Sequence, residues 1–242
     1  MTARLERLPK GRHSLPQELV VASQQRRLLR AMADAVAENG YAETTIADVV
    51  GRAGVSRKTF YERYDGKQEC FLALYDAGVA VLQARVAAAV EACPRPEDRV
   101  LAGIDAFLAV LDERPAVFRA IVLESHAAGP EFAQRRRAMM RTFAELYQEI
   151  NEQARALDPA IPPLTDEIAL GVVGGILELV CDRVTSGRAE SLSALAEPLS
   201  AFVVRSAAAP AAPGERGSAD TSPRKPATDA ARIGRVEKRL SF

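Results

Sequence analysis

Seven side chains between residues 45 and 67 suit binding to a polyanion rather than catalysis. The group combines cations with hydroxyl and phenol groups, which donate hydrogen bonds to phosphate oxygens and to the edges of bases. Its members are Thr45, Ser56, Arg57, Lys58, Thr59, Tyr61 and Lys67. Such side chains bind duplex DNA when a rigid element holds them on one exposed face. Their use therefore depends on the elements around them.

The sequence around these side chains predicts two short helices joined by a tight turn. Thr45 and Asp48 form a capping-box pattern, which marks the start of a helix over 45–53. Gly54 permits the left-handed backbone with which the chain reverses direction, and Ser56 suits the N-cap of the next helix.

The second short helix is expected over 56–64 and has two different faces. Phe60 and Tyr64, four residues apart, face the neighbouring helices, whereas Arg57 and Lys58 lie on the opposite side. This pattern predicts a helix-turn-helix with a buried side and a polar, mostly basic, exposed side. An ordinary solvated helix face is the alternative explanation of the same charges.

The stretch resembles the tetracycline-repressor (TetR) family of bacterial regulators. The resemblance is carried by Gly40-Tyr41, Thr44-Thr45, Ala53-Gly54-Val55-Ser56, Thr59-Phe60-Tyr61, Tyr64 and Lys67. Beyond Ala77 only the layout of helices is similar. The resemblance implies a transcription regulator that binds a palindromic double-stranded DNA operator as a homodimer. It also implies a repressor that an unidentified small-molecule effector releases from the operator.

The resemblance also implies a role for each polar side chain. Arg57 and Lys58, with Ser56 at the N-cap, lie at the start of the recognition helix and face base edges in the major groove. Thr45, Tyr61 and Lys67 bind phosphates, and Thr59 serves either purpose. The rival hypothesis is a helical protein-interaction module that has lost DNA binding. A salt-dependent affinity for DNA would separate the two.

Helical periodicity continues through the rest of the chain and predicts an all-α protein of about nine helices. The first helix is expected to end at Gly40. Further helices are expected at about 67–92, 97–113, 115–128, 130–157, 165–187 and 191–206. The domains are predicted as a flexible basic arm (1–17), a helix-turn-helix domain (18–66), a helical ligand-binding and dimerisation domain (67–206) and a disordered tail (207–242).

Large apolar residues on the central helices are candidates for the wall of an effector pocket. They are Phe107, Leu111, Phe118, Ile121, Met139, Phe143 and Tyr147, and His126 is the one polar member of the set. Flexible methionine and aromatic side chains suit an adaptable apolar cavity. An ordinary hydrophobic core explains the same residues equally well.

The last two predicted helices suit a dimer interface. The first is apolar on nearly all sides, so it has to bury two faces. Glycines in its interior permit close approach of another helix at a cost of about 1 kcal/mol each. The predicted interface residues are Gly171, Gly174, Gly175, Leu192, Leu195, Leu199 and Phe202. Packing within a single chain is the alternative.

Composition argues against other classes of protein. Two histidines, no nucleophile elbow and no phosphate-binding glycine loop give no support to an enzyme, a metal site or a cofactor site. Three cysteines in no paired spacing fit a reducing compartment. No apolar run long enough for a membrane span and no signal region are expected, so the protein is predicted to be cytoplasmic. The formal net charge is zero, but residues 1–67 are basic and residues 68–205 acidic.

Overall fold

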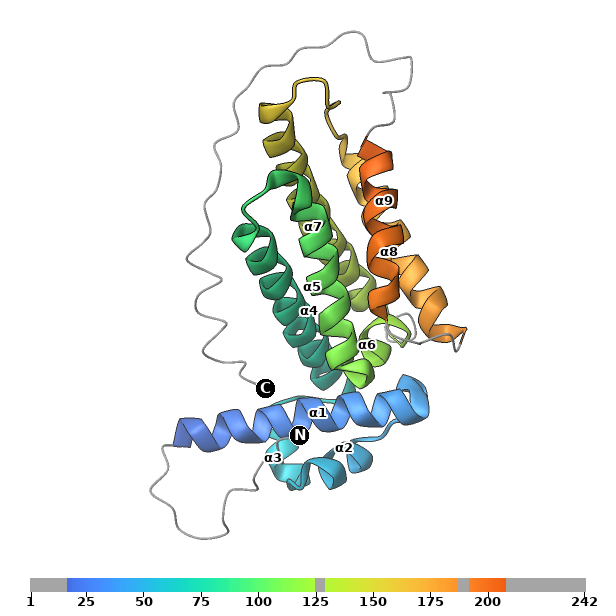
Figure 1. Ribbon diagram of the computed structural model, residues 1–242. Coiled ribbons are helices and arrows are strands. Elements are labelled where there is room, and N and C mark those ends of the chain that lie inside the picture. The colour runs from blue at the N-terminus through green and yellow to red at the C-terminus, as the bar shows by residue number, and fades with distance from the viewer. Residues whose placement is uncertain (1–16, 125–128, 187–191, 208–242) are drawn as a thin grey trace.

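A computed structural model describes residues 17–124, 129–186 and 192–207, and within these ranges the chain is helical with no strand. Figure 1 shows a small head lying across one end of a taller helical body. The predicted all-α class is confirmed. The predictions of a basic arm (1–17), of a disordered tail (207–242) and of a role for His126 fall outside the described residues, except that Gln17 and Ala207 are helical in the structure.

The head is built from the first three helices and the body from the other six. Their bounds are α1 (Gln17–Glu43), α2 (Ile46–Ala53), α3 (Arg57–Tyr61), α4 (Lys67–Ala92), α5 (Arg99–Glu113), α6 (Pro115–Val122), α7 (Pro130–Leu157), α8 (Asp166–Thr185) and α9 (Ala196–Ala207). Two short 3₁₀ helices, η1 (Pro96–Asp98) and η3 (Leu192–Leu195), precede α5 and α9. The predicted number and order of helices match the structure closely.

Several helix ends differ from the predictions. Helix α3 ends at Tyr61, because the Arg63 amide donates to the Phe60 carbonyl and turns the chain. Helix α6 ends at Val122, and Glu124 beyond it turns towards the head. The last predicted helix begins instead as η3 and becomes α-helical only at α9.

The hydrophobic core of the head continues into the body. One cluster joins buried residues of α1, α2 and α3 to α4, to Ala120 of α6 and to Phe132 of α7. The Phe71 ring stacks on Tyr41 and lies close to Phe132, with centroids 4.8 Å apart in both pairs. The predicted boundary between residues 66 and 67 therefore separates the proposed DNA-binding and ligand-binding roles. It does not separate two cores, because one hydrophobic cluster extends across it.

Helix α4 corrects one expectation. It contains an 18-residue window of mean hydropathy 1.4, so by length and composition it could cross a membrane, and the expectation that no run is long enough is wrong here. In the structure α4 packs against α5, α1, α6 and α7. Its buried residues, among them Phe71, Leu74 and Tyr75, belong to the protein core.

Candidate nucleic-acid interface and effector cavity

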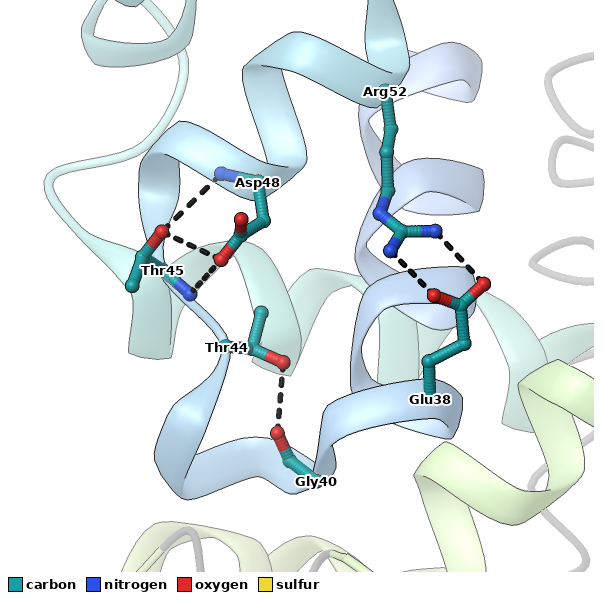
Figure 2. A network of polar contacts seen from close by, with 6 residues as sticks. All are labelled: Glu38, Gly40, Thr44, Thr45, Asp48 and Arg52. Atoms are coloured by element: carbon teal, nitrogen blue, oxygen red, sulfur yellow. Dashed lines mark hydrogen bonds and ion pairs between the residues drawn. The ribbon is translucent and has the colours of Figure 1, made fainter.

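Helix α2 begins with the predicted capping box (Figure 2). The Thr45 amide donates to Asp48 Oδ2 at 2.9 Å, and the Asp48 amide donates to Thr45 Oγ1 at 3.3 Å. The Thr45 hydroxyl also donates to Asp48 Oδ2 at 2.6 Å. Hydrogen bonds from the Thr45 side chain and backbone lower the pKa of Asp48 below its ordinary value. The start of α2 is therefore fixed by two side chains adjacent in space.

The chain reaches α2 through a kink at Gly40, which has φ 77° and ψ 160° inside the span of α1. The buried Thr44 hydroxyl donates to the Gly40 carbonyl at 2.7 Å, and this bond closes the turn before α2 (Figure 2). Arg52 at the end of α2 reaches back to Glu38 of α1, with Nη1 2.9 Å from Oε1. The two helices are thus joined at both ends of α2.

The turn between α2 and α3 has the expected left-handed glycine. Gly54 has φ 62° and ψ 41°, and its amide bonds the carbonyl of Gly51 at 3.3 Å. Arg27 of α1 donates from Nη1 to the Ala53 carbonyl at 2.9 Å. Sequence reasoning missed Arg27, because no local pattern marks a side chain that caps a helix 26 residues away.

Helix α3 presents the predicted donors to solvent. The Ser56 side chain caps the helix by accepting from the Thr59 amide at 3.0 Å. Arg57, Lys58 and Tyr61 are exposed, and the only ion pair that Lys58 makes with described residues is a long one of 4.0 Å to Glu62. Phe60, on the opposite side, is completely buried, as predicted. The arrangement leaves a cationic exposed face on a short helix that is held from behind.

Lys67 and Thr45, which are predicted to bind phosphate, both make hydrogen bonds within the protein. Lys67 Nζ donates to the carbonyls of Tyr41 at 2.8 Å and Ala42 at 3.1 Å, and it lies 4.5 Å from the centre of the Tyr41 ring. The Thr45 hydroxyl donates within its capping box. Both side chains stabilise the head, and their contacts with phosphate stay a prediction.

The backbone of Tyr41 is held by hydrogen bonds from two parts of the body. Its carbonyl accepts from Lys67 at the start of α4, and its amide donates to Glu124 Oε2, beyond α6, at 2.9 Å. Since Tyr41 follows directly after the Gly40 kink, α1, α4 and the end of α6 meet at one point. No sequence pattern predicts the bond to Glu124, which lies 83 residues away.

A cavity of about 1070 Å³ lies between α1 of the head and α4, α5, α6, α7, α8 and α9 of the body. The structure places seven of the eight predicted pocket residues in its wall: Phe107, Leu111, Phe118, Ile121, Met139, Phe143 and Tyr147. The Tyr147 hydroxyl donates to the Val203 carbonyl of α9 at 2.8 Å, and burial raises the pKa of this phenol to about 12. A cavity of this size is large enough for a small-molecule ligand.

The predicted dimer residues divide into two groups. Leu192 and Leu199 are buried in the chain's own core, and Leu195 packs against the same cluster. A Cβ added at Gly174 would lie 3.3 Å from Met140, and one at Gly175 would lie 3.2 Å from Phe202. These residues serve packing within the chain, because Met140 of α7 covers Gly174 and Phe202 of α9 covers Gly175.

Gly171 and Phe202 remain exposed. An added Cβ at Gly171 would meet nothing within 4 Å, and Phe202 is 36% exposed. Leu170 and Leu179 of α8 and Val204 of α9 are further large apolar residues that are exposed in the single chain. An interface with a second copy on these helices stays a prediction that rests on this smaller set.

Comparisons with known proteins agree with this architecture. Residues 28–74 match the model of the "Bacterial regulatory proteins, tetR family". The HTH-type transcriptional regulator EthR of Mycolicibacterium smegmatis is 30% identical over 139 residues, which span 55% of this chain and 60% of that protein. The HTH-type transcriptional activator FasR of the same species is 25% identical over 128 residues, 53% of this chain and 58% of that protein. The chain thus covers about three fifths of these relatives.

Solved structures extend the likeness of fold into the body. The fatty acid degradation regulator FadR of Bacillus halodurans superposes with a TM-score of 0.69 at 15% identity, over 75% of this chain and 94% of that one. FadR of Bacillus subtilis, in complex with stearoyl-CoA, gives 0.67 at 17% identity, over 75% and 98%.

Proposed function

We propose that the chain is a DNA-binding transcriptional regulator of the tetR family of bacterial regulatory proteins, and that it acts as a cytoplasmic repressor that a small molecule releases from its operator. The observation that carries the proposal is the exposed cationic face of α3 on a fully capped helix-turn-helix, joined by one core to a body that contains a large apolar cavity. The activator FasR among its relatives makes transcriptional activation the alternative.

Contacts with DNA are proposed from the exposed side of α3. Arg57 and Lys58 are free to enter the major groove, where arginine most often binds guanine. Ser56, Thr59 and Tyr61 lie beside them and can donate to phosphates or bases. Thr45 and Lys67 lie at the starts of α2 and α4, where the positive end of the helix dipole favours phosphate.

Replacing Arg57 with alanine is expected to weaken operator binding by about 1–3 kcal/mol and to relax specificity at one base pair of each half-site. Competition binding with operators changed one base pair at a time measures both effects. Arg137→Ala, an exposed arginine of α7, is the matched control and should leave affinity unchanged. A uniform loss across all operator positions would contradict a base contact by Arg57.

Replacing Lys67 with alanine is expected to weaken binding to every sequence alike and to reduce the slope of log affinity against log salt concentration by about 1. The melting temperature should also fall, because the carbonyls of Tyr41 and Ala42 lose their donor. A salt titration and a thermal melt separate the two roles. An unchanged salt slope with a lowered melting temperature would leave Lys67 only its structural role.

A homodimer is proposed because a palindromic operator needs two recognition helices about 34–36 Å apart. The exposed residues Leu170, Gly171 and Leu179 of α8 and Phe202 and Val204 of α9 supply an apolar surface for it. Sedimentation equilibrium of the full chain measures the mass directly. A monomer at micromolar concentration would contradict this part of the proposal, and substitution of Leu179 by arginine should dissociate the dimer.

The effector is proposed to bind in the cavity and to favour a form whose recognition helices no longer fit successive major grooves. Helix α6 is suited to transmit the change. Its Phe118 and Ile121 line the cavity, and Glu124 beyond it holds the amide of Tyr41 in the head. Helix α4, which begins at Lys67, is the second connection.

Filling the cavity should separate ligand response from DNA binding. We propose stearoyl-CoA, the ligand in the Bacillus subtilis FadR complex, as the probe, and expect it to release operator DNA from the unchanged protein. Val173→Phe adds a ring to the cavity wall, so the probe should no longer release DNA from that variant, while DNA affinity stays unchanged. Leu101→Phe, on the exposed side of α5, is the control and should respond like the unchanged protein. Normal release from the Val173 variant would place the effector site elsewhere.

The whole proposal is tested by enriching genomic DNA fragments on the purified full chain and sequencing them. We expect a palindrome with half-sites about one helical turn apart, and repression of a reporter placed behind it. Activation of the reporter would support the alternative. A folded protein that enriches no sequence at any salt concentration would contradict the proposal.

A further inference from the structure

The wall of the cavity changes character from its far end to the end nearest the head. Beside α5 and α7, far from the head, it consists mostly of apolar side chains such as Ile104, Leu146 and Ile150. Arg99 also lines this end, but its guanidinium donates to the Cys93 carbonyl and to Gln153. At the near end the wall is completed by α1, which belongs to the helix-turn-helix domain. The cavity therefore lies against both the body and the head.

Helix α1 turns one face towards the cavity, and that face carries arginines. Leu19, Ala22 and Ser23 are followed by Arg26 and, one turn later, Arg30. Across all the described lining residues there are six arginines but three carboxylates. The carboxylates are Asp34, Glu113 and Glu178. The excess charge favours an anion.

The α1 arginines differ in how far they are already engaged. The Arg27 guanidinium donates hydrogen bonds to the carbonyls of Ala53 and Gly54. Arg30 makes a long ion pair of 3.9 Å with Asp34. Arg26 is half-buried and makes no hydrogen bond or ion pair with any other described residue. Arg26 and Arg30 are thus the guanidinium groups on this face with capacity for a ligand.

We propose that the ligand is an amphipathic anion whose apolar chain fills the body and whose charged group binds Arg26 and Arg30 of α1. The inference rests on the proposed function and names the ligand class of the same cavity. Guanidinium groups bind carboxylates and phosphates through short charge-assisted hydrogen bonds. Because α1 is part of the DNA-binding head, the ligand joins head and body directly through its own charged end.

The test uses three probes with the same twelve-carbon chain: laurate, lauroyl-CoA and the uncharged dodecan-1-ol. Calorimetric titration into the full chain should give tighter binding of at least one anionic probe than of the alcohol. In an Arg26→Gln/Arg30→Gln double variant that preference should fall by on the order of tenfold, with binding of the alcohol unchanged. Arg137→Gln, an exposed arginine outside the cavity wall, is the matched control.

The two anionic probes identify the source of the charge. If the double variant binds laurate more weakly, the arginines bind a carboxylate. If it loses affinity for lauroyl-CoA alone, they bind the phosphates of that probe. Either result supports the proposal. Equal affinity for charged and uncharged probes, or an equal loss for all three in the variant, would overturn it. Binding of operator DNA without binding of any probe would overturn the ligand class while leaving the regulator intact.

Discussion

Replacing Phe60 with alanine is expected to lower the free energy of unfolding by about 3–5 kcal/mol, the cost of emptying a large buried site. The Phe60 side chain is completely buried, and its ring contacts those of Tyr61 and Tyr64 at centroid distances of 5.5 and 5.7 Å. It also holds the back of α3, whose other side carries the proposed DNA contacts. Urea denaturation of the purified chain measures the loss.

The next residue provides the control for that experiment. Tyr61 is 55% exposed, so Tyr61→Ala removes little buried area and should cost no more than about 1.5 kcal/mol through its edge contact with Phe60. Its operator affinity should nevertheless fall if Tyr61 binds phosphate. Similar losses of stability from both substitutions would show that the two faces of α3 are not buried as differently as the structure has them.

Replacing Gly40 with alanine is expected to destabilise the protein by about 2–4 kcal/mol. At φ 77° and ψ 160° the backbone of Gly40 lies in a region that is nearly restricted to glycine. An added Cβ would also lie 3.3 Å from Glu124 Oε2, the oxygen that accepts from the Tyr41 amide. Backbone strain and the weakened hydrogen bond therefore both lower the free energy of unfolding of the Gly40→Ala variant.

Gly51→Ala is a control in the same domain, and we expect it to change the stability in the opposite direction. Gly51 lies inside α2, and an added Cβ there would meet nothing within 4 Å. Gly51→Ala should therefore stabilise the protein by about 0.5–1 kcal/mol through helix propensity. Thermal melts of both variants compare them directly. A Gly40 variant as stable as the Gly51 variant would contradict the strained kink.

The local parts of the interface could be predicted from sequence because their signals are local. The capping box of Thr45 and Asp48, the left-handed Gly54 and the Ser56 cap each depend on residues within three or four positions. The buried side of α3 followed from the spacing of Phe60 and Tyr64. Periodicity and caps fix such features before any tertiary contact forms.

The contacts that join separate helices could not be predicted in this way. Arg27, Lys67 and Glu124 bond carbonyls or amides that lie 25 to 83 residues away, and nothing near them in the sequence marks these partners. The end of α3 was also missed, because its apolar spacing continues to Tyr64 after the helix has become a turn. Tertiary geometry decides these points.

The glycines of α8 show a different limit. Their presence indicates close approach of another helix, but the sequence does not say whether that helix comes from the same chain or from a second copy. In the structure Gly175 packs against Phe202 of α9 in the same chain, whereas no described residue packs against Gly171. One compositional signal therefore has two structural explanations within the same helix.

The core that crosses from head to body limits how this protein can be recombined with its relatives. A chimera cut after residue 66 would remove Phe71, Tyr75 and Phe132 from the cluster that buries Phe60 and Leu28. The transplanted head would then expose an apolar surface in place of its missing neighbours. A regulator with exchanged specificity therefore has to carry the first turns of α4 with the head, and matching residues at Ala120 and Phe132 in the recipient body.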